Sequence, residues 1–400
     1  MLRPFHYGPF LRYFLSQSIS SVGNRVYALA LPFLIFELGG DAGDLGTAFT
    51  AFSVPQLLFL LVGGLAVDRL PRRQLMILAD LLRLAVLAVV VVRLATGTPT
   101  LLEVHLMAGL FGFASAFFQP ASFSIVPELL PKEELASGNS LRAFSQEMAG
   151  VLGPPIGGVL VASGGVAFAL GFDLLTFVVG VALLFTLPGA PPTDPDVHEP
   201  FAFRQEFLAG FDYVLGSTWL WLTILIFASV NVFMAGSIAV VLPVVAESSL
   251  GGAAALGWLL AAMAGGALGG SLLLGQLGLR RRRGLTAYLG VAVSGFCLLS
   301  FALVPTMTVG LTSMFLLGAS LILFGVIWES TVQELVPAQM LGRVISIDML
   351  GSFALLPLGY LLLGRAVQAY GPAVVLFTCG TLTVALVLVG LAVPAIRRLD

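Results

Sequence analysis

The feature that most limits the fold of this chain is a series of apolar stretches, each as long as a membrane is thick. A transmembrane helix needs about 20 apolar residues to cross a hydrocarbon core of about 30 Å. Of the 400 residues, 58% are hydrophobic and 10% charged, whereas soluble domains carry about 25% charged residues. We therefore predict an all-α integral membrane protein with twelve transmembrane helices, placed to within a few residues at 10–37, 47–67, 74–95, 102–126, 138–162, 167–187, 217–245, 253–278, 285–305, 308–332, 344–367 and 372–394.

One polar stretch divides the chain. Residues 188–200 are rich in proline and acidic side chains and form the only long polar segment. Beyond them Phe203, Phe207 and Phe211 recur at helical spacing, which predicts an amphipathic helix lying on the membrane surface. The sequence thus predicts an N-terminal six-helix bundle over 1–187, a cytoplasmic linker with an amphipathic helix over 188–216, and a C-terminal six-helix bundle over 217–400.

The few charged residues limit location and partners. The net charge is −2 and no basic tract lies outside the loops, so a nucleic-acid partner is not expected. Only Arg93 and Arg365 lie near one side of the predicted spans, and the other arginine clusters lie on the opposite side. The positive-inside rule therefore places both termini in the cytoplasm of a multi-pass protein of the plasma or inner membrane. Without an ATP-binding loop or a histidine cluster, no cofactor, no metal site and no enzymatic reaction are expected.

A short loop between the second and third predicted spans holds five residues at the spacing G-x-x-x-D-R-x-x-R-R, namely Gly64, Asp68, Arg69, Arg72 and Arg73. Gly64 would let another helix pack closely, and Asp68 could cap the N-terminus of a neighbouring helix. The arginines can bind carboxylates through paired hydrogen bonds. A simple topology anchor made of three arginines is the alternative, and it stays open.

This spacing resembles the signature loop between the second and third spans of the major facilitator superfamily of transporters. The resemblance implies two pseudo-symmetric six-helix bundles and a conformational latch, formed by these five residues, that favours the outward-facing state. Glu128 and Glu334 end the fourth and tenth predicted spans. They would be the carboxylate partners of this loop and of its counterpart, the cluster Arg280–Arg283, at an inner gate. Asp348 lies where the latch helix of the family begins, and its partner could be an arginine of the first loop.

Internal repeats agree with this plan. Residues 127–131 (Pro-Glu-Leu-Leu-Pro) match 333–337 (Gln-Glu-Leu-Val-Pro), and 155–157 match 357–359. Transporters of several families are built from such repeats, related by an axis along the membrane normal.

The fifth predicted span carries the pattern G-P-x-x-G-G, formed by Gly153, Pro154, Gly157 and Gly158. It resembles a motif that is associated with antiporters of the superfamily, and so favours export by exchange. A packing kink without bearing on transport direction is the alternative. Residues 116–121, 135–141 and 20–24 are similar to the drug and macrolide efflux and enterobactin-exporter-like branch, although many members place Asp where Asn24 stands.

Polar residues in the first span predict part of a transport pathway. Gln17, Ser21 and Arg25 are spaced i, i+4, i+8 and share one helical face, with Asn24 beside them. A charge in the middle of a membrane costs roughly 2.5–3.5 kcal/mol or more. Arg25 therefore either forms an ion pair that locks helices together or lies in a polar cavity, where it binds an anionic substrate or tunes a proton-carrying acid.

Three acidic residues are candidates to carry a coupled proton, because burial penalises a charged carboxylate. Glu147 lies on one face with the G-P-x-x-G-G pattern, or else pairs with Arg142 or Arg25. Glu329 lies in the tenth span, or else is wetted from the cytoplasm, and Asp173 is placed near the outer end of the sixth span, most simply in a structural role.

Two further predictions concern the cavity and the third span. Asn231 of the seventh span could line the cavity or pack in the core. Asp80 and Arg83 are three residues apart on the third span, which predicts an ion pair near the inner surface.

These expectations define a secondary active transporter that exports small amphipathic molecules, of drug, macrolide or siderophore type, by proton antiport and alternating access. Its partners would be the substrate, protons and the lipid bilayer, and the resemblance implies a monomer. The alternative is a lysolipid-type amphiphile flippase or uniporter without proton coupling. A membrane sensor or scaffold is a third class, which an intact latch would not require.

Overall fold

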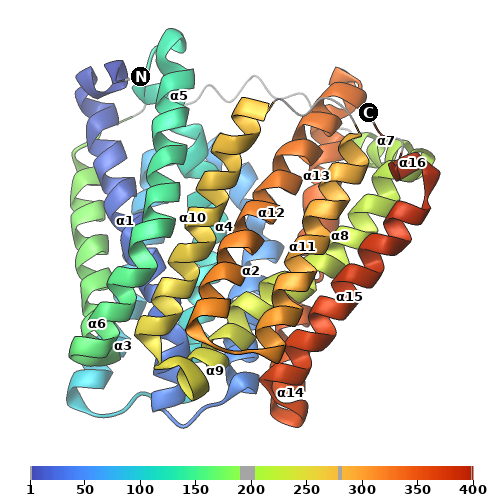
Figure 1. Ribbon diagram of the computed structural model, residues 1–400. Helices are drawn as coiled ribbons and strands as arrows, with labels where there is room; N and C mark the ends of the chain where they lie inside the picture. Colours follow the sequence, from blue (N-terminus) through green and yellow to red (C-terminus); the bar gives the residue numbers. More distant parts are fainter. Residues whose placement is uncertain (1, 190–202, 278–281, 398, 400) are drawn as a thin grey trace. The chain divides into compact units, whose positions relative to one another are not determined.

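The computed structural model describes residues 2–189, 203–277, 282–397 and 399. The described residues form helices and contain no strand, because lipid offers no hydrogen-bond partner to the backbone and each span must satisfy its own. The helices are α1 (Gly8–Glu37), α2 (Ala42–Arg69), α3 (Arg72–Thr96), α4 (Leu101–Ser124), α5 (Val126–Leu129), α6 (Leu135–Phe185), α7 (Phe203–Gly216), α8 (Thr218–Gly236), α9 (Leu242–Val245), α10 (Ala253–Leu277), α11 (Arg283–Leu303), α12 (Met307–Leu335), α13 (Ala338–Phe353), α14 (Leu356–Tyr370), α15 (Pro372–Ala392) and α16 (Pro394–Arg397) (Figure 1).

Twelve membrane spans follow from these helices. Within the described residues, ten helical stretches are long and apolar enough to cross a membrane. One of them, Lys132–Phe185, contains two spans, because Gly165 interrupts α6 with φ 75° and ψ 175°. The 28-residue helix α2 supplies the remaining span. The prediction of an all-α protein with twelve transmembrane helices is confirmed.

The chain divides into two compact units. Unit 1 comprises Met1–Val197 and Gly251–Ala261, and unit 2 comprises His198–Leu250 and Ala262–Asp400. The beginning of α10 groups with unit 1 because it packs against α6, where Gly158 lies close to Ala254 and Gly257 close to Pro154. The predicted linker lies partly outside the described residues, which omit 190–202, so its exact bounds stay a prediction.

Close backbone approaches hold each unit together. In unit 1, α1 lies beside α6 and α2 beside α4 (Figure 1). A Cβ built on Gly112 of α4 would overlap the carbonyl oxygen of Phe52 in α2. In unit 2, a Cβ on Gly318 of α12 would overlap the carbonyl oxygen of Met263 in α10. Small residues permit such contacts in membranes, where dispersion forces rather than water drive helix association.

These contacts reveal the internal repeat in three dimensions. The numbers of Gly112 and Gly318 differ by 206, and those of their neighbours Phe52 and Met263 by 211. The left-handed glycines at positions 165 and 371 also differ by 206, with φ angles of 75° and 81°. Corresponding positions in the two halves therefore make corresponding contacts, and the predicted pseudo-symmetry of two six-helix bundles is confirmed.

Candidate functional site

Two matching ion pairs join an arginine to a glutamate, one within each unit. In unit 1, Arg72 at the start of α3 donates to Glu128 of α5. In unit 2, Arg283 at the start of α11 donates to Glu334 of α12 across 2.6 Å. The two arginines differ by 211 in number and the two glutamates by 206, the same offsets as the packing contacts. The pairings suggested by the sequence are present, whereas their role at an inner gate stays a prediction.

Arg73 caps the end of the sixth span instead of binding a carboxylate. Its Nε donates to the carbonyl oxygen of Leu184 at 3.0 Å and its Nη2 to that of Phe185 at 2.5 Å. Arg12 of α1 donates to the next carbonyl, that of Thr186, at 2.6 Å. The last carbonyls of a helix lack internal partners and carry partial negative charge, so cations stabilise them. The sequence reasoning did not identify this role for Arg73.

Gly64 makes no close helix contact within unit 1, so its predicted role in close packing stays a prediction. No atom lies within 4 Å of a Cβ built on Gly64. The neighbouring Gly63 faces α4 instead, where a Cβ would overlap the carbonyl group of Ala116, whose carbon lies at 2.9 Å, and would meet Phe117 Cα at 3.2 Å. The sequence places both glycines correctly in the second span, but only the direction of the helix face distinguishes them.

The remaining loop residues stay less defined. Asp68 belongs to the last turn of α2, but its side chain lies outside the described residues, and its predicted capping role stays a prediction. Arg69 is exposed, and no described residue forms a hydrogen bond or ion pair with it. Among the described residues it is therefore left without a polar partner.

Asp348 of α13 is held within unit 2 by neutral donors. Trp328 Nε1 donates to its Oδ2 at 2.9 Å, and Ser352 Oγ donates to its Oδ1 at 3.4 Å. The predicted pairing of Asp348 with an arginine of the first loop stays a prediction. The indole of Trp328 therefore positions the half-buried carboxylate of Asp348 next to a group of aromatic side chains.

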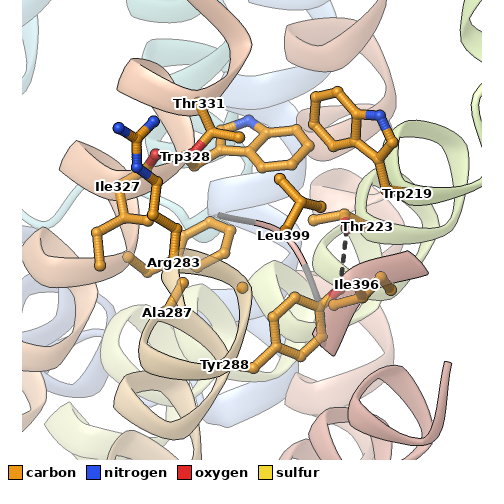
Figure 2. Close-up of a pocket in the computed structure, with 12 residues that line it drawn as sticks. Trp219, Thr223, Arg283, Ala287, Tyr288, Ile327, Trp328, Thr331, Ile396 and Leu399 are labelled. Carbon is orange, nitrogen blue, oxygen red and sulfur yellow. Dashed lines mark hydrogen bonds between the residues drawn. The ribbon is translucent and has the colours of Figure 1, made fainter. Parts of the chain in front are cut away.

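These aromatic side chains border a small pocket in unit 2. Figure 2 shows Trp219 and Trp328 on one side and Tyr288 on the other, where it hydrogen-bonds Thr223 at 3.0 Å. Arg283 lies at its margin. The lining residues are Trp219, Thr223, Arg283, Gly284, Ala287, Tyr288, Phe324, Ile327, Trp328, Thr331, Ile396 and Leu399. The predicted gate pair of unit 2 thus adjoins a small, mainly apolar pocket that the C-terminal residues help to form.

The polar face of α1 becomes more exposed along its length. Gln17 is half-buried and accepts a hydrogen bond from Ser122 at 3.2 Å, while its buried Nε2 has no partner. Asn24 is half-buried, and Arg25 is exposed. The described residues provide neither a hydrogen bond nor an ion pair to Arg25, so the helix-locking ion pair that the sequence left open is not formed in the described part of the chain.

The G-P-x-x-G-G pattern packs α6 against two partners. A Cβ on Gly153 would overlap the side chain of Arg25, and one on Gly157 would meet Val26 Cα at 3.2 Å. Gly158 and Pro154 lie on the side that contacts the beginning of α10. The helix keeps helical backbone angles through this pattern and leaves them only at Gly165. The structure thus assigns the pattern to close packing, and its effect on transport direction stays a prediction.

The two acids favoured by the sequence are both exposed. Glu147 is exposed and forms no ion pair among the described residues, and its alternative partner Arg142 stacks on Phe123 at 3.8 Å. Glu329 is exposed and accepts a hydrogen bond from Gln333 at 3.5 Å. These acids lie in α6 and α12 respectively, so the described geometry does not single out either as a proton carrier.

Asn231 has a structural contact. Its Nδ2 donates to the carbonyl oxygen of Ser352 at 3.2 Å and so ties α8 to α13. Being half-buried, it is compatible with the cavity role that the sequence suggested, which stays a prediction.

Asp80 and Arg83 form the ion pair that the sequence predicted, and its place near the inner surface stays a prediction. Arg83 Nη1 donates to Asp80 Oδ1 at 3.2 Å, and the side chains of Asp80 and Arg83 are only 1% and 6% exposed. Arg83 Nη2 also donates to Ser115 of α4 at 2.8 Å. Asp173 is fully buried eight residues after the break at Gly165 and interacts electrostatically with Arg83. Sequence reasoning named these residues but could not show that separate helices bring them together.

The family model for the Major Facilitator Superfamily matches residues 13–360. The Enterobactin exporter EntS of Shigella boydii serotype 18 is 27% identical over 335 residues, covering 83% of this chain and 78% of that protein. EntS of Salmonella choleraesuis is likewise 27% identical, covering 83% and 79%.

Solved structures share the fold. A mutant of the nucleoside transporter NupG superposes with a TM-score of 0.78 at 12% identity, covering 96% of this chain and 99% of that one. A bacterial homologue of the human lysosomal transporter Spinster gives 0.75 at 13% identity, covering 98% and 96%. At such low identity these structures bear on the fold alone. The twelve spans, the repeat and the family match together show that the chain belongs to the Major Facilitator Superfamily and is a multi-pass membrane transporter, not an enzyme.

Proposed function

We propose that this protein exports a siderophore-like, amphipathic small molecule with anionic character across the inner membrane. The observation that carries the proposal is the similarity to the Enterobactin exporter EntS, which extends over 83% of the chain and includes the spans of both halves. The proposal transfers the general class of cargo from that relative, and does not require the same compound.

The chemistry of α1 supports an anionic cargo. Arg25 lies 17 residues after the start of α1 and 12 before its end, which corresponds to about 26 Å and 18 Å along the helix. A guanidinium at that depth needs water or an anion, because hydrocarbon solvates it poorly. It has no partner among the described residues, and it shares a face with Gln17. Together they offer a fixed cation and an amide to the oxygen atoms of a substrate.

We further propose that export proceeds by alternating access and exchange for protons, with both termini in the cytoplasm. The ion pairs Arg72–Glu128 and Arg283–Glu334 place charged contacts at matching positions of the two halves. Arg69 is exposed without a described partner and can engage a new carboxylate in another state. A latch of this kind biases an equilibrium between conformations, since its contacts differ between the two.

Inside-out membrane vesicles containing the full chain test the proposal. Enterobactin, the probe used, is supplied outside vesicles that have an acidic interior. The wild type is expected to accumulate it inside. Arg25→Gln should reduce accumulation by about tenfold or more, because a hydrogen bond to a charged group contributes about 1.5–3 kcal/mol.

Arg93→Gln is the matched control. Arg93 lies in the last turn of α3, where it pairs with Glu103 at 3.2 Å and is 46% exposed, so this change removes an arginine outside the pathway. Equal accumulation by the Arg25 and Arg93 variants would refute the role of Arg25. Movement of a fluorescent lysophospholipid without any movement of enterobactin would refute the proposed function and favour an amphiphile flippase.

A further inference from the structure

A buried polar cluster inside unit 1 has a composition that helix packing does not explain. Asp80 and Arg83 come from α3, Asp173 from the second span of α6, and Tyr27 from α1. Arg83 interacts electrostatically with the other three. One oxygen of each carboxylate and the hydroxyl group of Tyr27 are buried without a hydrogen-bond partner. Such unpaired groups are unusual in a folded interior and call for an explanation.

The cluster is sealed from solvent and lies away from the helix ends. Asp80 lies eight residues after the start of α3, and Asp173 eight residues after the break at Gly165, each about 12 Å along its helix. Asp80 and Asp173 are 1% and 0% exposed. The ring of Phe118 covers the guanidinium of Arg83 at 4.8 Å. Neither carboxylate can therefore be neutralised by water or mobile ions in this conformation.

The charges of the cluster do not balance. Around the two carboxylates, α1 contributes Tyr27, α3 contributes the single guanidinium of Arg83, and α4 contributes the neutral Ser115. On α6, Thr176 donates a hydrogen bond to Asp173 Oδ1 at 3.2 Å. Two carboxylates and one guanidinium leave one negative charge, which a medium of low dielectric strongly disfavours. One added proton makes the cluster neutral.

Unit 2 shows that the fold does not need these charges. With the offsets of the repeat, the positions matching Asp80 and Arg83 are Val291 and Ser294, and the position matching Asp173 is Cys379. All three are buried, at 0%, 0% and 2% exposure. The same helix arrangement is thus built with neutral side chains, and the charged set in unit 1 must serve another purpose.

We propose that Asp80 and Asp173 share a single exchangeable proton, and that this is the proton exchanged for substrate. This inference rests on the proposed function for the coupling, but not for the presence of the proton. When the cluster opens to water, the O–H bond of the protonated carboxyl breaks, the proton passes to water, and a carboxylate remains. Reprotonation from the opposite side restores neutrality and lets the cluster close. Arg83 acts as a positioning residue that holds the second carboxylate charged.

Infrared spectroscopy of the full chain in lipid nanodiscs tests the shared proton without any substrate. The wild type should show a carbonyl stretch of a protonated carboxyl group that shifts in deuterated buffer. Asp80→Asn and Asp173→Asn should each abolish this band, because one remaining carboxylate is balanced by Arg83. Glu133→Gln, which alters an exposed acid outside the cluster, should retain it. A band that persists in both Asn variants overturns the proposal.

A second variant protects the test against misfolding. Asp173→Cys copies the residue at the matching position of unit 2 and leaves the Asp80–Arg83 pair intact. It should fold and lack the band. A folded Asp173→Cys protein that keeps the band overturns the proposal.

Transport measurements then test the coupling. In vesicles with enterobactin, Asp173→Asn should lose accumulation driven by a pH gradient but keep substrate counterflow, which needs no net proton transfer. Loss of both, or accumulation driven by sodium in the wild type, overturns the coupling role. A wild type that moves no enterobactin would count against the proposed function, whereas the infrared result would still decide the shared proton.

Discussion

The two adjacent glycines at the end of α2 provide a direct test of how this structure packs. Changing Gly63 to Ala adds a methyl group towards α4, where the carbonyl carbon of Ala116 lies at 2.9 Å and Phe117 Cα at 3.2 Å from the new Cβ. Both obstacles are backbone atoms, which cannot move aside as a flexible side chain can. The same change at Gly64 meets no atom within 4 Å.

The expected difference follows from these distances. Overpacking in a well-packed interior costs about 1–3 kcal/mol. Replacing glycine by alanine in a helix stabilises by about 1 kcal/mol, and this gain is common to both variants. Their difference therefore isolates the packing cost of about 1–3 kcal/mol. For a unit of this size, each kcal/mol shifts the melting temperature by roughly 2–4 °C, so Gly63→Ala should melt several degrees below Gly64→Ala.

The assay is the loss of monodisperse protein after stepwise heating in detergent, recorded for the wild type and both variants. Gly63→Ala should fall below the wild type, and Gly64→Ala should match or exceed it. Equal melting of the two variants, or a lower value for Gly64→Ala, would refute the orientation of α2 described above. If Gly64→Ala is stable but inactive in transport, the glycine has a conformational role that its surroundings in unit 1 do not explain.

Two further changes test local features with the same heating assay. Gly165→Ala should lower stability by about 1–3 kcal/mol, because a positive φ with ψ near 180° is accessible essentially to glycine alone. The control Gly171→Ala lies in open, regular helix and should be neutral or stabilising. Equal effects of the two changes would contradict the break in α6. Arg73→Ala should lower stability by about 1–3 kcal/mol, because it removes charge-assisted hydrogen bonds to the last carbonyls of α6. The control Arg69→Ala should change stability by no more than about 0.5 kcal/mol. The reverse order would contradict the capping role of Arg73.

The membrane fold was accessible to sequence reasoning because the solvent dictates it. Lipid forces each span to be a helix of defined length, and therefore the apolar stretches alone locate the spans. The ion pairs Arg72–Glu128 and Arg283–Glu334 were also foreseeable, since charged residues at span ends have few possible partners.

The candidate site was less accessible. Sequence reasoning favoured Glu147 and Glu329, which the structure leaves exposed, and it assigned Asp173 a structural role. The polar residues Asp80, Arg83 and Asp173 within apolar spans were a visible signal, but periodicity reports only which face of a single helix a residue occupies. Which faces of different helices meet is decided by packing across the bundle.

The sequence by itself therefore determined that this chain crosses the membrane twelve times, repeats its six-span plan and belongs among facilitator transporters, because each of these properties depends on local composition or on motifs short enough to read in order. Only the tertiary structure decided that Gly63 rather than Gly64 contacts another helix of unit 1, and that Asp80, Arg83 and Asp173 share one sealed interior. The physical reason is that contacts between helices depend on rotation and depth, which residues far apart in the chain fix jointly.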